Sequence, residues 1–79
     1  MDKEMKQIDY GSLVEVGENY SDAAFAGKTG SVSGIYTVED KRIADLRGCR
    51  IGDIFYLIEI SDGSSKEIAS NFVSKAIIL

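Results

Sequence analysis

The clearest hydrophobic pattern in the chain is the alternation over residues 54–60, IFYLIEI. Neighbouring side chains of an extended chain point to opposite faces. The segment therefore presents two sets of residues: Ile54, Tyr56, Ile58 and Ile60 on one face, and Phe55, Leu57 and Glu59 on the other. Such alternation of β-branched and aromatic residues predicts a strand. Because apolar residues occupy both faces, we expect this strand to be central and covered on both sides.

Residues 12–17, SLVEVG, alternate in the same way and predict a first, half-buried strand. Val14 and Val16 share its apolar face, and the residues between them face the solvent. A loop follows over residues 18–28, and we expect its one aromatic residue near the second strand, Phe25, to fold inward onto the core.

Residues 29–38, TGSVSGIYTV, predict a second strand. Val32, Tyr36 and Val38 fall on one parity, which places all three on the core face. Two glycines interrupt the segment, and glycine in a strand marks a bend or a bulge. We therefore expect this strand to be strongly curved.

The strand pattern stops over residues 39–53, EDKRIADLRGCRIGD. Ile43 and Leu46 lie three positions apart, as on one side of a helical turn, and Gly48 is placed to end such a turn. A short helix and an irregular hairpin arm both fit this segment.

The end of the chain predicts a hairpin and one more strand. Asp62-Gly63 is a tight-turn pair, and residues 66–70, KEIAS, form the returning strand. Residues 70–73, SNFV, are too few for a regular helix, and residues 75–79, KAIIL, predict a short last strand.

Five short strands with long early connections and tight late ones predict an all-β fold, a small and strongly bent barrel. A sandwich would need about seven strands. Seventy-nine residues are enough for one domain. We assign residues 1–9, which are polar without a period, to a flexible lead-in, and residues 10–79 to the barrel domain.

Two stretches resemble known small barrels. The hairpin followed by Ser70, Asn71, Phe72 and Val73 resembles the end of Src-homology-3-like barrels, in which a one-turn 3₁₀ helix precedes the last strand. The stretch FAGKTGSVSGI is similar to the Gly-x-x-Gly-x-Val turn of KOW-type barrels of ribosomal and transcription proteins, at Gly27, Gly30 and Val32. The resemblance implies a five-stranded Src-homology-3-like barrel with a 3₁₀ turn near Asn71.

The peptide-binding members of that class are a poor match. They line a polyproline groove with an Ala-Leu-Tyr-Asp-Tyr-like stretch and a tryptophan, and this chain has neither. Phe72 stands where their groove carries a tyrosine. The resemblance therefore extends to the fold and not to polyproline binding.

Composition excludes most catalytic and metal-site chemistry. The chain has no histidine and a single cysteine, Cys49, so the commonest general base and metal ligand are absent and no internal disulfide can form. We predict no enzymatic activity, no metal and no cofactor. The start of the chain lacks the apolar stretch of a signal peptide and no run reaches the ~18 apolar residues of a membrane span, so we expect a cytoplasmic protein.

The Gly-Lys-Thr of residues 27–29 is better explained as a structural turn than as a phosphate loop. A phosphate loop has a further glycine five positions earlier, where this chain has Asp22, and is followed by a helix. A strand is predicted here instead.

Charge is uneven along this acidic chain, whose net charge is −4. Four basic residues lie between positions 41 and 50 against Asp45 alone, which gives a local +3: Lys41, Arg42, Arg47 and Arg50. A solvated loop and a patch for an acidic partner both fit this stretch. The net charge argues against broad contact with nucleic acid.

Two functional hypotheses follow. The favoured one is a non-catalytic protein-interaction module, a small subunit or regulator that docks on a larger assembly through this basic stretch or through a strand edge. The alternative is a KOW-like contact with RNA or the ribosome, carried by these residues: Lys28, Lys41, Arg42, Arg47 and Arg50.

The chain ends in an apolar run. A barrel can bury only alternate members of Ile77, Ile78 and Leu79, so we expect at least one to face outward beside Leu13. Such a patch would serve as a protein-docking site or a homodimer seam. In the alternative, the whole run completes the core.

Overall fold

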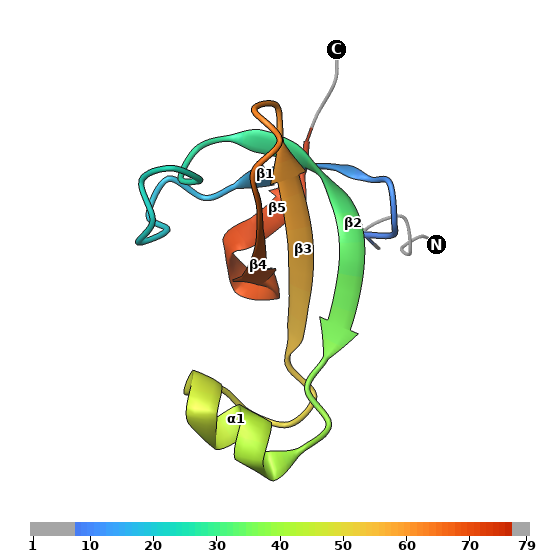
Figure 1. Ribbon diagram of the computed structural model, residues 1–79, viewed down its shortest axis with the longest axis vertical. Helices are drawn as coiled ribbons and strands as arrows, with labels where there is room; N and C mark the ends of the chain where they lie inside the picture. Colours follow the sequence, from blue (N-terminus) through green and yellow to red (C-terminus); the bar gives the residue numbers. More distant parts are fainter. Residues whose placement is uncertain (1–7, 77–79) are drawn as a thin grey trace, which may run out of the picture.

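The computed structural model describes residues 8–76. These residues form five strands, a short helix and a 3₁₀ turn (Figure 1). In chain order the elements are β1 (Leu13–Val16), β2 (Thr29–Thr37), α1 (Lys41–Arg47), β3 (Ile54–Ile60), β4 (Ser65–Ala69), the 3₁₀ turn η2 (Ser70–Phe72) and β5 (Val73–Lys75). The prediction of a small all-β fold with five strands is confirmed.

All five strands belong to one antiparallel sheet in the order β4-β3-β2-β1-β5. β2 is the longest strand and pairs with both β1 and β3, so it bends from one side of the core to the other (Figure 1). β4 and β5 are the edges and do not pair with each other in the part of the chain described. The sheet is therefore not closed.

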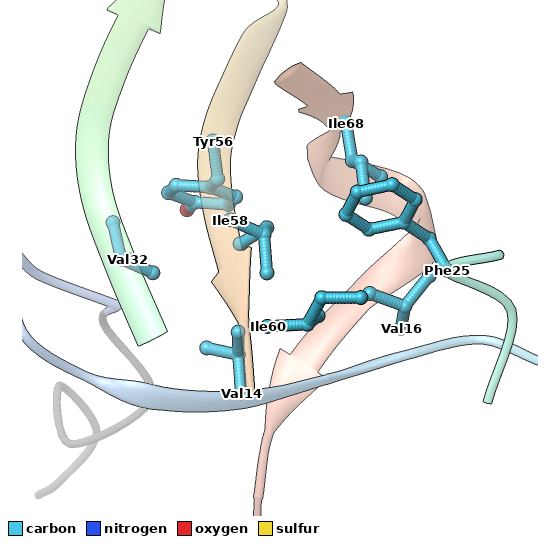
Figure 2. Packing of buried hydrophobic residues seen from close by; sticks show 8 residues of the cluster. All are labelled: Val14, Val16, Phe25, Val32, Tyr56, Ile58, Ile60 and Ile68. Carbon is cyan, nitrogen blue, oxygen red and sulfur yellow. The ribbon is translucent and has the colours of Figure 1, made fainter. Parts of the chain in front are cut away.

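The core lies on the concave face of this bent sheet. Figure 2 shows its side chains converging from several strands and one loop. The buried cluster consists of Val14, Val16, Phe25, Val32, Tyr56, Ile58, Ile60 and Ile68. Val14, Val16 and Ile58 are fully buried, as the alternation of their strands predicts. Phe25 enters from the loop between β1 and β2, which confirms that it folds inward.

The opposite face of β3 is only partly covered. Phe55 and Leu57 are half-buried there, and Glu59 is exposed. A Cβ added to Gly34 would lie 3.2 Å from the Leu57 Cβ, so β2 approaches β3 closely on this side. The expected cover on both sides of β3 is therefore only partial on this face, because one layer of sheet leaves the outer face to single side chains.

A bulge in β2 changes which residues reach the core. Val32 pairs with Ile58, but Gly34 pairs with Leu57, so β2 carries one extra residue between them. Beyond the bulge the faces are exchanged. Tyr36 lies opposite Phe55, outside the core, and the prediction that it shares the core face of Val32 is wrong.

The connection from β2 to β3, residues 38–53, is hereafter called the arm. It contains α1, which begins where Asp40 accepts a hydrogen bond from the Arg42 N–H at 2.7 Å. The helix ends at Gly48, whose φ of 71° is left-handed, and the Cys49 N–H returns to the Ala44 carbonyl at 2.9 Å. This Schellman ending confirms the helical reading of the segment. Figure 1 shows α1 beyond the end of β2 and β3, away from β1 and β5.

The C-terminal part follows the predicted order of hairpin, 3₁₀ turn and strand. Asp62 Oδ1 accepts the Ser64 N–H at 2.8 Å in the tight turn, and η2 places a 3₁₀ turn at Asn71. The last strand begins earlier than the predicted residues 75–79, because Val73 already pairs with Val16 of β1. Residues 77–79 lie outside the described part of the chain.

The glycine turn before β2 is a corner of the sheet. Gly27 has a left-handed φ of 74° and donates its N–H to the Val16 carbonyl at 3.0 Å. β2 begins two residues later, so the helix that a phosphate loop requires does not follow. At Gly30 a Cβ would lie 2.5 Å from the Glu59 carbonyl oxygen, which explains why a side chain is missing there.

Candidate interaction surface

Most of the charge on the arm is locally paired. Lys41 Nζ lies 3.1 Å from Asp45 Oδ1, one helical turn away. Arg42 Nε lies 3.9 Å from Asp40 Oδ1, and its side chain is 92% exposed. Such exposed pairs contribute little to stability, but they offset the positive charge that the sequence places here.

Arg47 ties the arm to the sheet. Its guanidinium lies 4.7 Å from the ring centre of Phe55 and 5.4 Å from that of Tyr36, and Arg47 Nη2 bonds Glu67 Oε1 of β4 at 2.6 Å. The bulge in β2 makes this arrangement, since it turns Tyr36 to the side of Phe55. Stacking on two rings and a partly exposed ion pair each contribute about 0.5–1 kcal/mol.

Arg50 differs from the other three basic residues of the stretch. Its backbone N–H donates to Asp53 Oδ2 at 3.0 Å, which closes the turn before β3. Its exposed guanidinium makes no ion pair within residues 8–76. It is thus the one cation of the arm that keeps its charge uncompensated in the described part of the chain.

A groove of about 700 Å³ lies between the arm and η2. Its lining comes from the arm, the beginning of β3, the last residue of β4 and η2. The lining residues are Arg47, Gly48, Cys49, Arg50, Asp53, Ile54, Phe55, Ala69, Ser70, Asn71 and Phe72. The Phe72 ring packs edge-to-face against the Tyr20 ring, with ring centres 5.1 Å apart.

Two large aliphatic side chains of the arm face the solvent. Leu46 in α1 is 84% exposed, and Ile51 in the following turn is 57% exposed. The spacing of Ile43 and Leu46 predicts a shared side of a helical turn, and neither Leu46 nor Ile51 is among the binding residues predicted from the sequence. No feature of the sequence singled out Leu46 or Ile51, and the buried residue of α1 is Ala44.

The predicted C-terminal patch is described only at its first strand. Leu13 is 41% exposed on β1, and its carbonyl accepts the Ala76 N–H at 3.0 Å. The chain therefore runs along β1 beyond β5. Ile77, Ile78 and Leu79 lie outside the described residues, and their part in a patch stays a prediction.

The residues of the nucleic-acid alternative do not form one surface. Lys28 lies just before β2, where its Nζ is 3.5 Å from the Ala24 carbonyl, whereas α1 follows the other end of that strand. Figure 1 shows the two ends on opposite sides of the sheet.

Cys49 and the acidic residues were the other candidates for chemistry. Cys49 is free and half-buried at the end of α1. The carboxylates of Asp53, Asp62 and Glu67 each accept a hydrogen bond from a nearby N–H group. Across the described residues, no group of three or more potential ligands is placed to hold a metal ion.

A separate ion pair joins the loop before β2 to the outer strand β4. Lys66 Nζ bonds Asp22 Oδ2 at 2.8 Å and lies 5.3 Å from the Tyr20 ring centre. The hydrogen bond from Lys66, with a second from the Ala24 N–H, lowers the pKa of Asp22 below its ordinary 3.8. The same contact raises the pKa of Lys66 above 10.5.

We expect this ion pair to contribute to the way the stability of the fold decreases at acidic pH. A carboxyl whose pKa is depressed on folding stabilises the protein above its unfolded pKa, and that stabilisation is lost as the pH falls through the folded value. The Tm should therefore decrease as the pH is lowered below about 4. Asp22→Asn should lower the Tm at neutral pH and reduce the further decrease of the Tm at acidic pH. Lys66→Met should have the same two effects. Thermal melts followed by circular dichroism test this. An equal loss of Tm at acidic pH in Asp22→Asn and in the wild type would contradict it.

No protein family, curated protein or solved structure matches this chain. No helix among residues 8–76 is long and apolar enough to cross a membrane.

Proposed function

We propose that the protein is a non-catalytic interaction module that docks on a larger protein assembly through the arm. The observation that supports this most is the exposure of Leu46, at 84%, on a helix that projects from the sheet. Ile51 adds a second exposed aliphatic side chain five residues further on. Single exposed apolar residues are common on protein surfaces, but two on one projecting element suit insertion into a partner.

The surroundings of these two residues suit a protein partner. Protein interfaces place an apolar anchor at the centre and polar groups at the rim, and they are depleted of unpaired charge at the core. On the arm, the cations of Lys41 and Arg42 lie beside carboxylates of the same helix segment. Their charges would therefore not oppose burial of the neighbouring aliphatic side chains.

The same pairing disfavours the nucleic-acid alternative. Binding to a phosphate backbone draws its free energy from cations that replace counterions. Lys41, Arg42 and Arg47 already face carboxylates, and Lys28 lies at the other end of β2. A basic surface of the size that RNA contact needs is not supported by this arrangement.

We propose further that the fold is an open form of the Src-homology-3-like barrel. Support comes from the order of elements: the glycine turn at Gly27 and Gly30 opens β2, and a hairpin followed by η2 precedes the last strand. The module would use this fold as a rigid frame that presents the arm.

The test is co-purification from the cells that make the protein, with and without nuclease. Leu46→Asp should weaken binding of the partner by about fivefold or more, since loss of a buried apolar anchor costs about 1–3 kcal/mol. Leu13→Asp is the matched control, because it changes an exposed leucine on β1, outside the arm.

The possible results separate three interpretations. Loss of the partner with Leu46→Asp and retention with Leu13→Asp supports docking through the arm. The reverse result would place the interface beside β1, at the predicted C-terminal patch. Loss of all partners on nuclease treatment would overturn the proposal in favour of nucleic-acid binding.

A further inference from the structure

We infer that the groove between the arm and η2 holds an extended peptide segment with an acidic side chain next to an apolar one. This inference rests on the proposed function, because it supplies the chemistry of the partner segment that lies beside the docked arm. It concerns different residues, so the two can fail separately.

Three residues of the groove lining are apolar and pack against their neighbours. Ile54 and Phe55 at the beginning of β3 are half-buried, and Phe72 of η2 is backed by the Tyr20 ring. Phe55 is further held by the guanidinium of Arg47 above its ring. A volume of about 700 Å³ is sufficient for two or three side chains of a peptide.

Of the charged side chains that line the groove, Arg50 is the one cation without an ion pair among the described residues, and the Asp53 carboxylate beside it has none either. Arg47 is engaged by Glu67 at 2.6 Å, and the Asp53 carboxylate accepts the Arg50 backbone N–H at 3.0 Å. The guanidinium of Arg50 has no ion pair within the described residues. A guanidinium binds a carboxylate through two parallel hydrogen bonds, so the groove matches one acidic side chain.

The side chain of Asn71 can bind a peptide backbone. Asn71 of η2 is exposed and lines the groove, and none of the hydrogen bonds described for residues 8–76 uses its amide. An amide group donates and accepts, which are the two functions that an extended backbone requires. Arg50 and Asn71 thus line the same groove as the apolar side chains of β3 and η2.

A peptide suits these charges better than a nucleic acid. A phosphate chain brings one negative charge per nucleotide, whereas this groove offers a single free cation beside the carboxylate of Asp53. The second lining arginine, Arg47, is already paired. One carboxylate among apolar groups is the ligand that the lining complements.

The experiment is a titration of the whole chain, labelled with ¹⁵N, with two blocked pentapeptides. The probes are acetyl-Ala-Phe-Glu-Leu-Ala-amide and the same peptide with glutamine in place of glutamate. We expect weak binding, with the Kd near 1 mM, and about fivefold tighter binding of the glutamate peptide. Amide shifts should change in residues 47–55 and 69–72.

Matched variants test the role of the arginine. Arg50→Ala should remove the fivefold preference for glutamate, whereas Arg42→Ala should retain it, because Arg42 is equally charged but lies outside the groove. The amide spectrum of each variant reports whether it is folded. Both arginines are exposed, so we expect both variants to retain the wild-type pattern.

Four results would overturn the inference. They are equal binding of the two peptides, an equal loss with Arg42→Ala, no shift changes in the groove up to about 5 mM peptide, and tighter binding of a short oligothymidylate at the same amides. If the peptides fail while Leu46→Asp still loses the cellular partner, the proposed function stands and only the groove inference falls.

Discussion

Gly30→Ala is expected to lower the free energy of unfolding by about 3 kcal/mol. A Cβ at this position would lie 2.5 Å from the carbonyl oxygen of Glu59 and 2.8 Å from Cγ2 of Ile58. The first neighbour is backbone of β3, and it cannot move without disturbing the pairing of Gly30 with Ile60 in the adjacent register. Urea unfolding followed by circular dichroism measures the loss.

Gly48→Ala separates this steric cost from the loss of glycine's freedom. At Gly48 a Cβ meets nothing within 4 Å, but its φ of 71° is unfavourable for alanine. We expect a cost of about 1 kcal/mol, confined to the end of α1. If Gly30→Ala costs no more than Gly48→Ala, then β2 and β3 are further apart at Gly30 than described.

The strands and the core could be predicted from the sequence because alternation is a local property. Val14 and Val16 in β1, and Ile58 in β3, are buried where the period of two places them. The turn at Asp62-Gly63 and the helix end at Gly48 were predictable for the same reason, since each is specified by one residue that favours a particular backbone conformation.

The sequence predicted that β2 could bulge, but it did not predict which face the residues after the bulge occupy. Gly34 marks a place where a strand can bulge, and the register does shift between Val32 and Gly34. Which face Tyr36 occupies depends on whether the extra residue lies before or after it, and that is decided by pairing with β3. A parity argument that runs through the bulge therefore assigns Tyr36 to the wrong face, whereas Val38, just beyond the end of β2, is buried as predicted.

The candidate surface depended still more on tertiary contacts. The basic residues were recognisable in the sequence, but the partner of Arg47 is Glu67, twenty residues away on β4. Leu46 was predicted only to share one side of a helical turn with Ile43. It is 84% exposed, whereas the buried residue of α1 is Ala44. Charge runs predict where a surface lies and do not predict how much of its charge remains free.

The second large effect is expected within β3, where two adjacent residues have opposite environments. Ile58 is fully buried at the centre of the core, and its truncation to alanine should lower the free energy of unfolding by about 4 kcal/mol. Leu57, its neighbour, is half-buried on the outer face against Gly34. Leu57→Ala should cost about 1.5 kcal/mol, because it removes less buried surface and leaves no enclosed cavity.

The ratio of these two losses tests which face of the sheet holds the core. A domain of this size is stable by roughly 5–10 kcal/mol, so Ile58→Ala should remain folded with a much lower urea midpoint. Equal losses for Ile58→Ala and Leu57→Ala would mean that the outer face is also enclosed. That result would favour the two-sided burial expected from the alternation of residues 54–60, and it would require an element that covers Leu57 as fully as the loop and strands cover Ile58.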